Sequence, residues 1–210
     1  MRGNTMRALC CYNALLALQA RVAAAIALGE PPVPPPLLSV VHETSGVLFL
    51  EKAPGVSFHA NPADEDNEAE PGVMQILRGM QERGELQHQE RLYSVHRLDR
   101  VTSGLLMVAK SRQAAGVLSQ MLRDKRVCKY YVALADKKPL KKMGTVKGDM
   151  ERSRRGQWML SRGLEKPAVT TFVSDVLEAE GERRLRAFLL RPLTGRTHQV
   201  RATCTTRLPV

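Results

Sequence analysis

The stretch Ser94-Val95-His96-Arg97-Leu98-Asp99-Arg100-Val101-Thr102-Ser103-Gly104 runs directly into Leu105-Leu106-Met107-Val108-Ala109. The first segment has apolar flanks and ends in a polar turn, and the second segment is apolar throughout. Apolar runs on both sides of a polar turn predict a strand, a turn and a second strand. We therefore expect Asp99 at the tip of this turn or in the cleft beside it.

Asp99 is the only carboxylate of this turn, and it lies between Arg97 and Arg100. Nearby positive charge favours the ionised form of a carboxyl group. An ionised and positioned carboxylate acts as a nucleophile or as a base. The residues alone are also consistent with a surface ion pair on a hairpin.

Four segments in order resemble motifs of the RluA-type RNA pseudouridine synthases, and the similarity extends over residues 38–201. Residues 96–106, His-Arg-Leu-Asp-Arg-Val-Thr-Ser-Gly-Leu-Leu, resemble the catalytic motif. Residues 51–56 resemble an upstream Asn-Lys-Pro-x-Gly-Val segment, with Glu51 and Ala53 as departures. Residues 127–134 resemble the Lys-x-Tyr strand, and residues 191–201 resemble the third motif.

The resemblance and the hydrophobic pattern both indicate an α+β fold, with a mostly antiparallel mixed sheet and a central catalytic cleft. Strands are expected at residues 47–52, 129–135, 169–176 and 184–190, and helices at residues 73–83 and 112–122 and after Thr197. Ser111 and Thr197 are expected to cap the last two helices. The packed face of the second helix is expected to contain Ala114, Val117, Leu118 and Met121. Residues 38–210 are expected to form the catalytic domain. Relatives continue beyond the third motif with closing strands, which we expect this chain to lack.

The resemblance implies an isomerase that converts uridine to pseudouridine. This reaction breaks the bond between the base nitrogen and the ribose, rotates the base and re-bonds the ribose through carbon 5. It needs no redox change and no group donor, so no cofactor is expected. The target base is stacked in folded RNA and has to be flipped out before it can react.

The resemblance also implies the catalytic residues. Asp99 is the carboxylate that attacks the nucleotide, and attack on the ribose carbon and elimination to a glycal remain alternative routes. Tyr131 packs against the base with its hydroxyl placed for proton transfer; a core tyrosine in a strand is the alternative. Arg201 pairs with Asp99 and orients the carboxylate.

Several further residues are expected to bind RNA. Arg97 matches a residue that engages the surroundings of the flipped nucleotide, and Arg100 and Arg196 are expected to contact phosphates. His198 and Gln199 are expected to donate or accept hydrogen bonds near the substrate. The alternatives are plain surface cations and, for His198, a structural histidine.

The segment of residues 137–162 is dense in cations. Arg152, Arg154 and Arg155 lie close in sequence to Trp158, the only tryptophan. Cations interleaved with an aromatic ring suit single-stranded RNA, through phosphate contacts and base stacking. The formal net charge of +11 also favours a polyanion as the partner. A charged and solvated hairpin is the alternative interpretation.

The sequence contains little that indicates a metal, a disulfide or a membrane. The four cysteines form no Cys-x-x-Cys pair, and the five histidines lack metal-ligand spacing. This cysteine usage suits a reducing compartment, and no apolar run is long enough to span a bilayer. We expect a monomer that binds RNA, with no metal, no membrane association and no obligate protein partner.

Residues 1–37 differ in composition from the rest of the chain. Residues 1–29 contain arginine and no acid, and a proline-rich linker follows at residues 31–36. This composition fits a transit peptide for a mitochondrion or plastid. A plain extension or a wrongly chosen start codon, with a cytoplasmic protein, is the alternative.

Two functions follow for the whole chain. The first is an RNA pseudouridine synthase that isomerises specific uridines in structured rRNA or tRNA. The second is a catalytically idle RNA-binding protein on the same scaffold.

Overall fold

The computed structural model describes residues 36–62, 69–153, 157–177 and 185–208. Contacts divide the described residues into two compact units, an N-terminal unit up to Val127 and a C-terminal unit from Cys128. Both units combine antiparallel sheets with helices, which confirms the α+β class. None of the helices in these residues is long and apolar enough to cross a membrane. The expected extension at residues 1–37 lies almost wholly outside the described residues.

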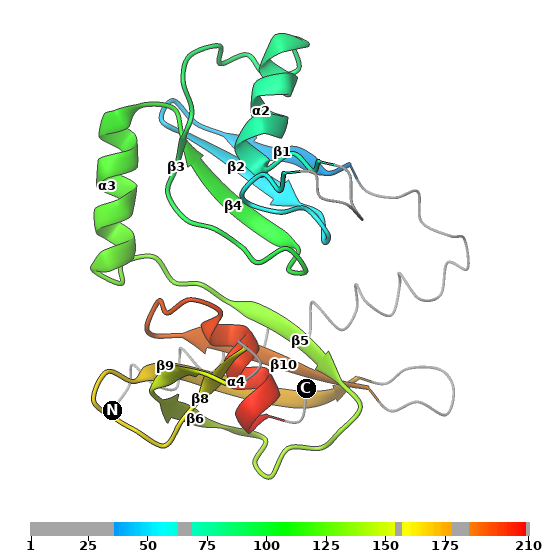
Figure 1. The fold of residues 1–210 in the computed structure, drawn as a ribbon, viewed down its shortest axis with the longest axis vertical. Helices are drawn as coiled ribbons and strands as arrows, with labels where there is room; N and C mark the ends of the chain where they lie inside the picture. The colour runs from blue at the N-terminus through cyan, green and yellow to red at the C-terminus, as the bar shows by residue number, and fades with distance from the viewer. Residues whose placement is uncertain (1–35, 63–68, 154–156, 178–184, 209–210) are drawn as a thin grey trace. The chain divides into compact units, whose positions relative to one another are not determined.

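The N-terminal unit contains an antiparallel sheet with strand order β1-β2-β4-β3 (Figure 1). The strands are β1 (Leu38–Glu43), β2 (Val47–Lys52), β3 (Tyr93–Ser94) and β4 (Gly104–Ala109). Residues 95–103 connect the short β3 to β4, so the predicted strand, turn and strand are present with a longer loop than a tight turn. Asp99 lies in this loop.

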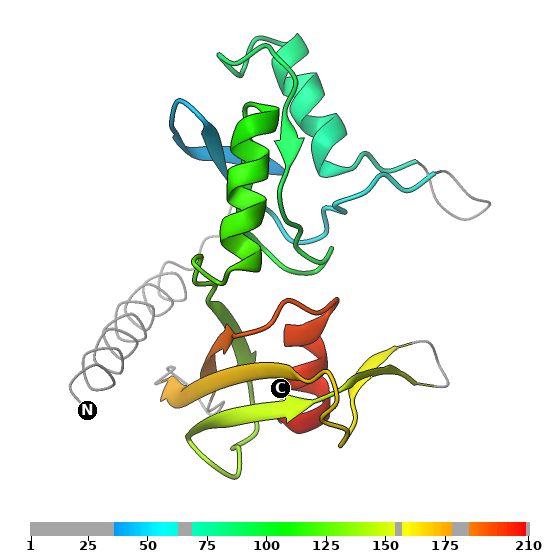
Figure 2. The same ribbon diagram turned by 90° about the vertical axis from the view of Figure 1, so that its left-hand side faces the viewer.

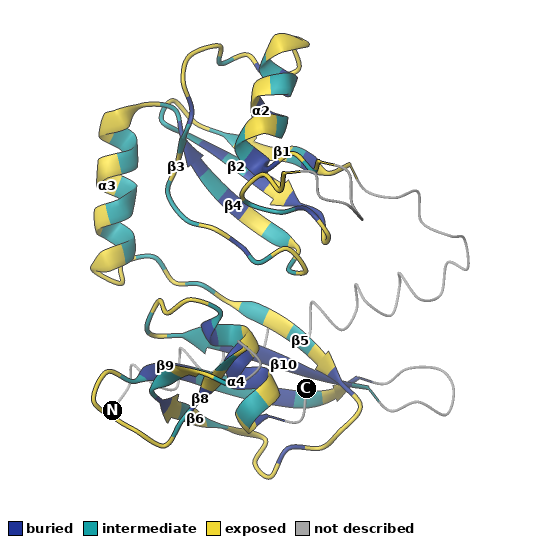
Figure 3. Cartoon of the chain, in the orientation of Figure 1, coloured by how far each residue is buried: buried dark blue, intermediate teal, exposed yellow. Residues whose placement is uncertain are grey.

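The buried side of this sheet follows the period of two in β2 and β4. Leu48 lies opposite Val108, Leu50 lies opposite Leu106, and all four side chains are buried. Helix α2 (Val73–Glu82) turns one apolar face inward, and its buried residues are Val73, Leu77 and Met80 (Figure 3). The inward face of α2 and the alternating strand residues therefore supply buried apolar side chains to this unit.

Helix α3 (Arg112–Arg123) contacts β3 and β4 but contains no fully buried residue. The Ser111 hydroxyl accepts a hydrogen bond from the Ala114 N–H at 3.1 Å, which confirms the predicted cap. The expectation that Val117 packs inward is wrong, because its side chain is 56% exposed. The other residues expected on this face, Ala114, Leu118 and Met121, are half-buried, as is Leu122.

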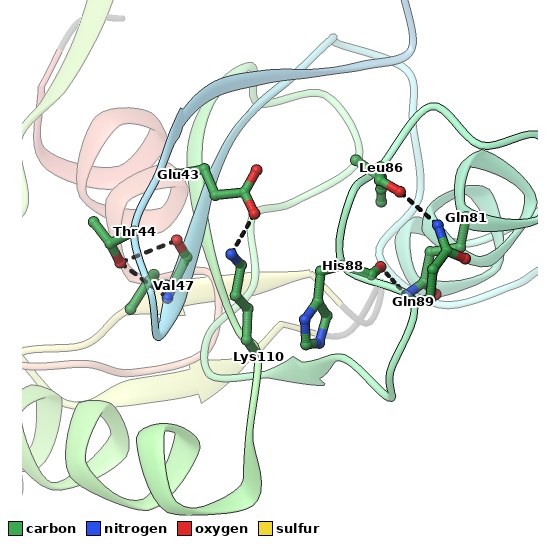
Figure 4. A network of polar contacts seen from close by, with 8 residues as sticks. All are labelled: Glu43, Thr44, Val47, Gln81, Leu86, His88, Gln89 and Lys110. Carbon is green, nitrogen blue, oxygen red and sulfur yellow. Dashed lines mark hydrogen bonds and ion pairs between the residues drawn. The ribbon is translucent and has the colours of Figure 1, made fainter.

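Polar contacts connect the loops of the N-terminal unit to its strands and to α2, as Figure 4 shows. The Lys110 ammonium, after β4, forms an ion pair with Glu43 at the end of β1. The Gln81 amide donates to the carbonyl oxygens of His88 at 2.7 Å and Glu90 at 2.9 Å. These bonds hold the irregular segment before β3 against α2.

The C-terminal unit contains a second antiparallel sheet with strand order β5-β10-β9-β6. Its strands are β5 (Tyr131–Ala135), β6 (Met143–Gly148), β9 (Ala168–Leu177) and β10 (Leu185–Pro192). A two-stranded ribbon, β7 (Met150–Arg152) and β8 (Trp158–Leu160), projects from it, and helix α4 (Gln199–Arg207) lies across one face (Figure 2).

Helix α4 completes the core of the C-terminal unit. Cys204 and Leu208 pack against Phe188 and Leu190 of β10. Burial raises the pKa of the Cys204 thiol to about 11, so this cysteine is a neutral core residue. Ala202 packs with Leu160 and Ala168 and thereby joins the ribbon to the sheet.

The expected cap of α4 is wrong by one residue. His198 is the N-cap, with a left-handed φ of 53°, and no side chain caps the helix. The backbone turn, in which the Gln199 N–H donates to the Arg196 carbonyl at 3.1 Å, sets the start of the helix instead. Arg201 still falls in the first turn, as expected.

Arg186 is a buried cation on β10. Its side chain is 7% exposed, and its Nη1 atom is buried with no hydrogen-bond partner among the described residues. An unpaired buried polar group costs free energy, and a buried charge costs more.

We predict that Arg186→Met raises the free energy of unfolding by about 1–3 kcal/mol, because it removes an unsatisfied donor and keeps the apolar stem. Urea denaturation measures this change. Arg191→Met is the matched control on the same strand, since Arg191 donates to Cys128 Sγ at 3.5 Å and lies over the Tyr130 ring. A lower stability for the Arg186 variant than for the unsubstituted protein would contradict the prediction.

Candidate active site

The Asp99 loop is fixed at both of its ends. Leu98 is buried and anchors the residue before the carboxylate, while Asp99 itself is half-buried. The Thr102 N–H donates to the Asp99 carbonyl at 3.0 Å and closes a turn after it. Before the turn, His96 Nε2 accepts from the Met107 N–H of β4 at 3.0 Å. The loop therefore holds its carboxylate on a constrained backbone.

A buried lysine fastens this loop to the end of β2. Lys52 is fully buried, and its ammonium donates to the carbonyl oxygens of Ala53, Val56 and Arg100 at 2.8, 3.0 and 3.2 Å. The Gly55 N–H donates to the same Arg100 carbonyl at 2.8 Å. Gly55 has a φ of 88°, a conformation that glycine adopts at no steric cost. Residues 51–56 and the Asp99 loop thus form one hydrogen-bonded substructure.

Lys52 is also an electrostatic partner of Asp99. Burial lowers the pKa of Lys52 below its ordinary value, and the attraction of the Asp99 carboxylate opposes that shift. Lysine is seldom fully buried unless it is paired, and here carbonyl oxygens and a carboxylate compensate the ammonium. The sequence identified the segment of residues 51–56 but gave Lys52 no role.

The two arginines beside Asp99 are exposed, unlike Lys52. Arg100 forms an exposed ion pair with Glu70, with Nη2 and Oε1 2.7 Å apart. Arg97 is exposed and forms no ion pair with the described residues. The expectation that both arginines bind RNA stays a prediction, and for Arg100 it requires exchange of a carboxylate for a phosphate.

Tyr131 and Arg201 belong to the C-terminal unit, whereas Asp99 belongs to the N-terminal unit. Tyr131 begins β5 and is half-buried against the cluster of Phe188, Leu190 and Cys204. Arg201 lies in the first turn of α4 and is exposed. Their expected catalytic roles stay predictions.

Gln199 organises the loop before α4. It is 4% exposed, and its Oε1 accepts from the Thr194 hydroxyl at 2.8 Å and the Arg196 N–H at 3.0 Å. Its Nε2 donates to the Val169 carbonyl and the Thr170 hydroxyl, both at 3.0 Å. The amide therefore holds the third motif against β9. Contact of Gln199 with RNA stays a prediction, as it does for the half-buried His198.

Arg196 and the ribbon present cations on the C-terminal unit. Arg196 is exposed, and its Nη2 donates to the Lys166 carbonyl at 3.4 Å. On the ribbon, Arg152 lies opposite Trp158 and its guanidinium sits 5.3 Å from the ring centroid. Arg154 and Arg155 lie outside the described residues. The ribbon thus combines an exposed cation and an aromatic face.

Asp149 fixes the base of the ribbon. Its carboxylate accepts from the Glu165 N–H at 3.0 Å and the Lys166 N–H at 2.9 Å, and its carbonyl accepts from the Ser161 N–H at 2.9 Å. Within the described ranges, no group of three or more His, Cys, Asp or Glu side chains gathers in a way that could hold a metal ion.

Comparisons with known proteins identify the family. A family model for RNA pseudouridylate synthases matches residues 46–206, and the chain belongs to this family. An uncharacterized RNA pseudouridine synthase of Haemophilus influenzae is 35% identical over 164 residues, covering 78% of this chain and 66% of that protein. Ribosomal large subunit pseudouridine synthase C of Escherichia coli is 32% identical over 167 residues, covering 77% and 47%. The RluA-type resemblance is confirmed.

A solved structure supports the fold. Human RNA pseudouridylate synthase domain containing 1 aligns with a TM-score of 0.62 and 27% identity, covering 84% of this chain and 67% of that chain. The chain spans about half to two thirds of the length of the relatives described above.

We predict that Lys52→Met loosens the Asp99 loop. The buried carbonyl oxygens of Ala53 and Val56 lose their donor, at a cost of about 1–3 kcal/mol each, partly offset because no ammonium is buried. Exchange of the amide hydrogens of Ala53, Gly55 and Val56 and of residues 99–102 should become about tenfold faster or more. Glu51→Gln, at the exposed neighbouring position, is the control. Unchanged exchange in the Lys52 variant would show that the ammonium does not hold the loop.

Proposed function

We propose that this chain is an RNA pseudouridine synthase that isomerises specific uridines in structured RNA, either rRNA or tRNA. The observation that carries the proposal is the half-buried carboxylate of Asp99 on a loop that Lys52 fastens. The family match and the relative named as a ribosomal large subunit synthase support an RNA substrate.

Isomerisation of uridine requires one carboxylate beside the flipped-out nucleotide. The bond between N1 and the ribose C1′ breaks, and a new bond forms between C5 and C1′. C5 then loses its hydrogen, and N1 gains a proton, so atoms and electrons balance without a cofactor. Lys52 holds the backbone of the Asp99 loop in place, because its ammonium donates both to residues 53–56 and to the Arg100 carbonyl.

We predict that Asp99→Asn abolishes isomerisation and leaves RNA binding nearly unchanged. The change keeps the size of the side chain and removes its charge and nucleophilicity. Release of tritium from RNA labelled at uridine C5 should fall by at least about a hundredfold, the smallest effect typical of a positioned acid–base group.

Asp136→Asn, at an exposed position of the C-terminal unit, is the matched control and should keep full tritium release. Appreciable release by the Asp99 variant would show that another group carries the reaction. RNA binding without tritium release by the unsubstituted protein would favour the alternative, a catalytically idle RNA-binding protein.

The ribbon is the second element of the proposal. Arg152 and Trp158 place a cation beside an aromatic face, which suits phosphate contact and base stacking on unpaired RNA. The bonds of Asp149 keep the base of the ribbon in a defined position.

We predict that Arg152→Gln weakens RNA binding and reduces the magnitude of the log–log salt slope by about one. Filter binding of an RNA stem–loop at several salt concentrations measures the slope. Arg83→Gln is the control, because Arg83 is an exposed arginine already paired with Glu85. Equal slopes for the Arg152 variant and the unsubstituted protein would show that the ribbon is a solvated surface that does not contact RNA.

Targeting to a mitochondrion or plastid by residues 1–29 remains part of the proposal. Fluorescence microscopy of residues 1–37 fused to a reporter protein tests it.

A further inference from the structure

The C-terminal end of helix α3 exposes a cluster of cations that the proposed chemistry does not use. We name this cluster, Arg123, Lys125 and Arg126, the α3 basic end. All three residues are exposed, and Figure 3 shows the exposed colour at this end of the helix. Lys125 has a left-handed φ of 58°, which non-glycine residues seldom adopt.

The left-handed lysine sits at a position where helices favour glycine. The Arg126 N–H donates to the Met121 carbonyl at 2.9 Å, and the Lys125 N–H donates to the Leu122 carbonyl at 3.3 Å. These two bonds define a Schellman motif, in which the left-handed residue is usually glycine. A lysine there is strained relative to glycine.

Helix α2 ends in the same motif with the expected residue. The Glu85 N–H donates to the Met80 carbonyl and the Gly84 N–H donates to the Gln81 carbonyl, both at 2.9 Å. Gly84 has a φ of 73°. The chain therefore uses glycine at one helix end and accepts a strained lysine at the corresponding position of the other.

The two helix ends also differ in how their charge is neutralised. After α2, Arg83 forms an ion pair with Glu85. In the last turn of α3, Gln120 Oε1 accepts from Arg123, and Gln120 Nε2 donates to Asp124 Oδ1 at 2.8 Å. The nearby carboxylate is thereby engaged by an amide, and the α3 basic end forms no ion pair with the described residues.

We propose that the α3 basic end binds the phosphodiester backbone of the RNA substrate, as a contact separate from the Asp99 loop and the ribbon. This inference rests on the proposed function, because it assigns a further contact to the same RNA. Gln120 holds one edge of the Arg123 guanidinium, and the remaining N–H donors suit phosphate oxygens.

A phosphate backbone fits this surface better than a protein partner does. Protein interfaces depend on buried aromatic or aliphatic anchors, and the exposed large apolar residue of α3 is Val117, well before the basic end. Cations at a helix C-terminus also interact favourably with the helix dipole. That interaction does not require a lysine at the left-handed position, where glycine would relieve the strain.

Lys125→Gly separates binding from stability. Relief of the left-handed strain should raise the melting temperature by about 2–4 °C, the shift that corresponds to about 1 kcal/mol in a protein of this size. Loss of one phosphate contact should reduce the magnitude of the log–log salt slope by about one, and at 0.1 M salt should weaken binding of an RNA stem–loop about five- to eightfold. A more stable protein that binds RNA less tightly is the expected result.

Arg126→Gln is the second variant, because it removes a charge and leaves the left-handed position unchanged. Its salt slope should fall by the same amount, whereas Arg83→Gln, which removes a paired arginine in the same unit, should keep the original slope. Unchanged slopes for both Lys125→Gly and Arg126→Gln would overturn the proposal. An equal fall for Arg83→Gln would also overturn it, because any surface cation would then suffice.

Binding of a poly-glutamate peptide tests whether the α3 basic end recognises RNA or any polyanion. If Lys125→Gly weakens binding of this peptide as much as binding of RNA, the surface recognises polyanions in general and the RNA assignment fails. Tritium release by the unsubstituted protein tests the proposed function separately. Absence of release together with a Lys125-dependent salt slope would refute the synthase and leave the RNA contact standing.

Discussion

The buried ammonium of Lys52 is the interaction on which the arrangement of the candidate site depends. A single group donates to carbonyl oxygens of two segments that lie far apart in sequence, and it attracts the Asp99 carboxylate. Burying a cation is costly unless it is compensated by hydrogen bonds and opposite charge. The carbonyl geometry of the 53–56 segment and the position of the Asp99 loop are therefore coupled, because displacement of either leaves the ammonium under-compensated.

The surplus positive charge of the chain divides into two kinds of cation. Lys110, Arg83 and Arg100 each have a carboxylate partner that compensates their charge. Arg97, Arg152 and the α3 basic end have no ion pair among the described residues. Exposed ion pairs contribute little to stability, whereas uncompensated cations contribute a field that attracts polyanions. The net charge of +11 therefore indicates a polyanion-binding surface only where the cations have no carboxylate partner.

The sequence predicted the elements whose signals are local. The strand expected at residues 47–52 has the observed bounds of β2, and Ser111 caps α3 as its type and position indicated. The role of Lys52 was not predictable, because its acceptors come from residues 53, 56 and 100 and meet only in the folded chain. The start of α4 was misplaced by one residue because a backbone turn, and not the Thr197 hydroxyl, satisfies the helix end.

Three residues depart from the usual preferences for backbone conformation or burial, and their surroundings differ. His198 is left-handed within the third motif, two residues after Arg196 and directly before the helix that carries Arg201. Lys125 is left-handed where the chain elsewhere uses Gly84, and it lies among uncompensated cations. Arg186 is buried, its Nη1 atom has no hydrogen-bond partner in the part of the chain that the structure describes, and it lies outside all four motifs. Departures from local preference concentrate at functional positions in natural proteins. Lys125 fits that expectation because the strained backbone presents an exposed cation, whereas Arg186 is 7% exposed and is predicted only to lower stability.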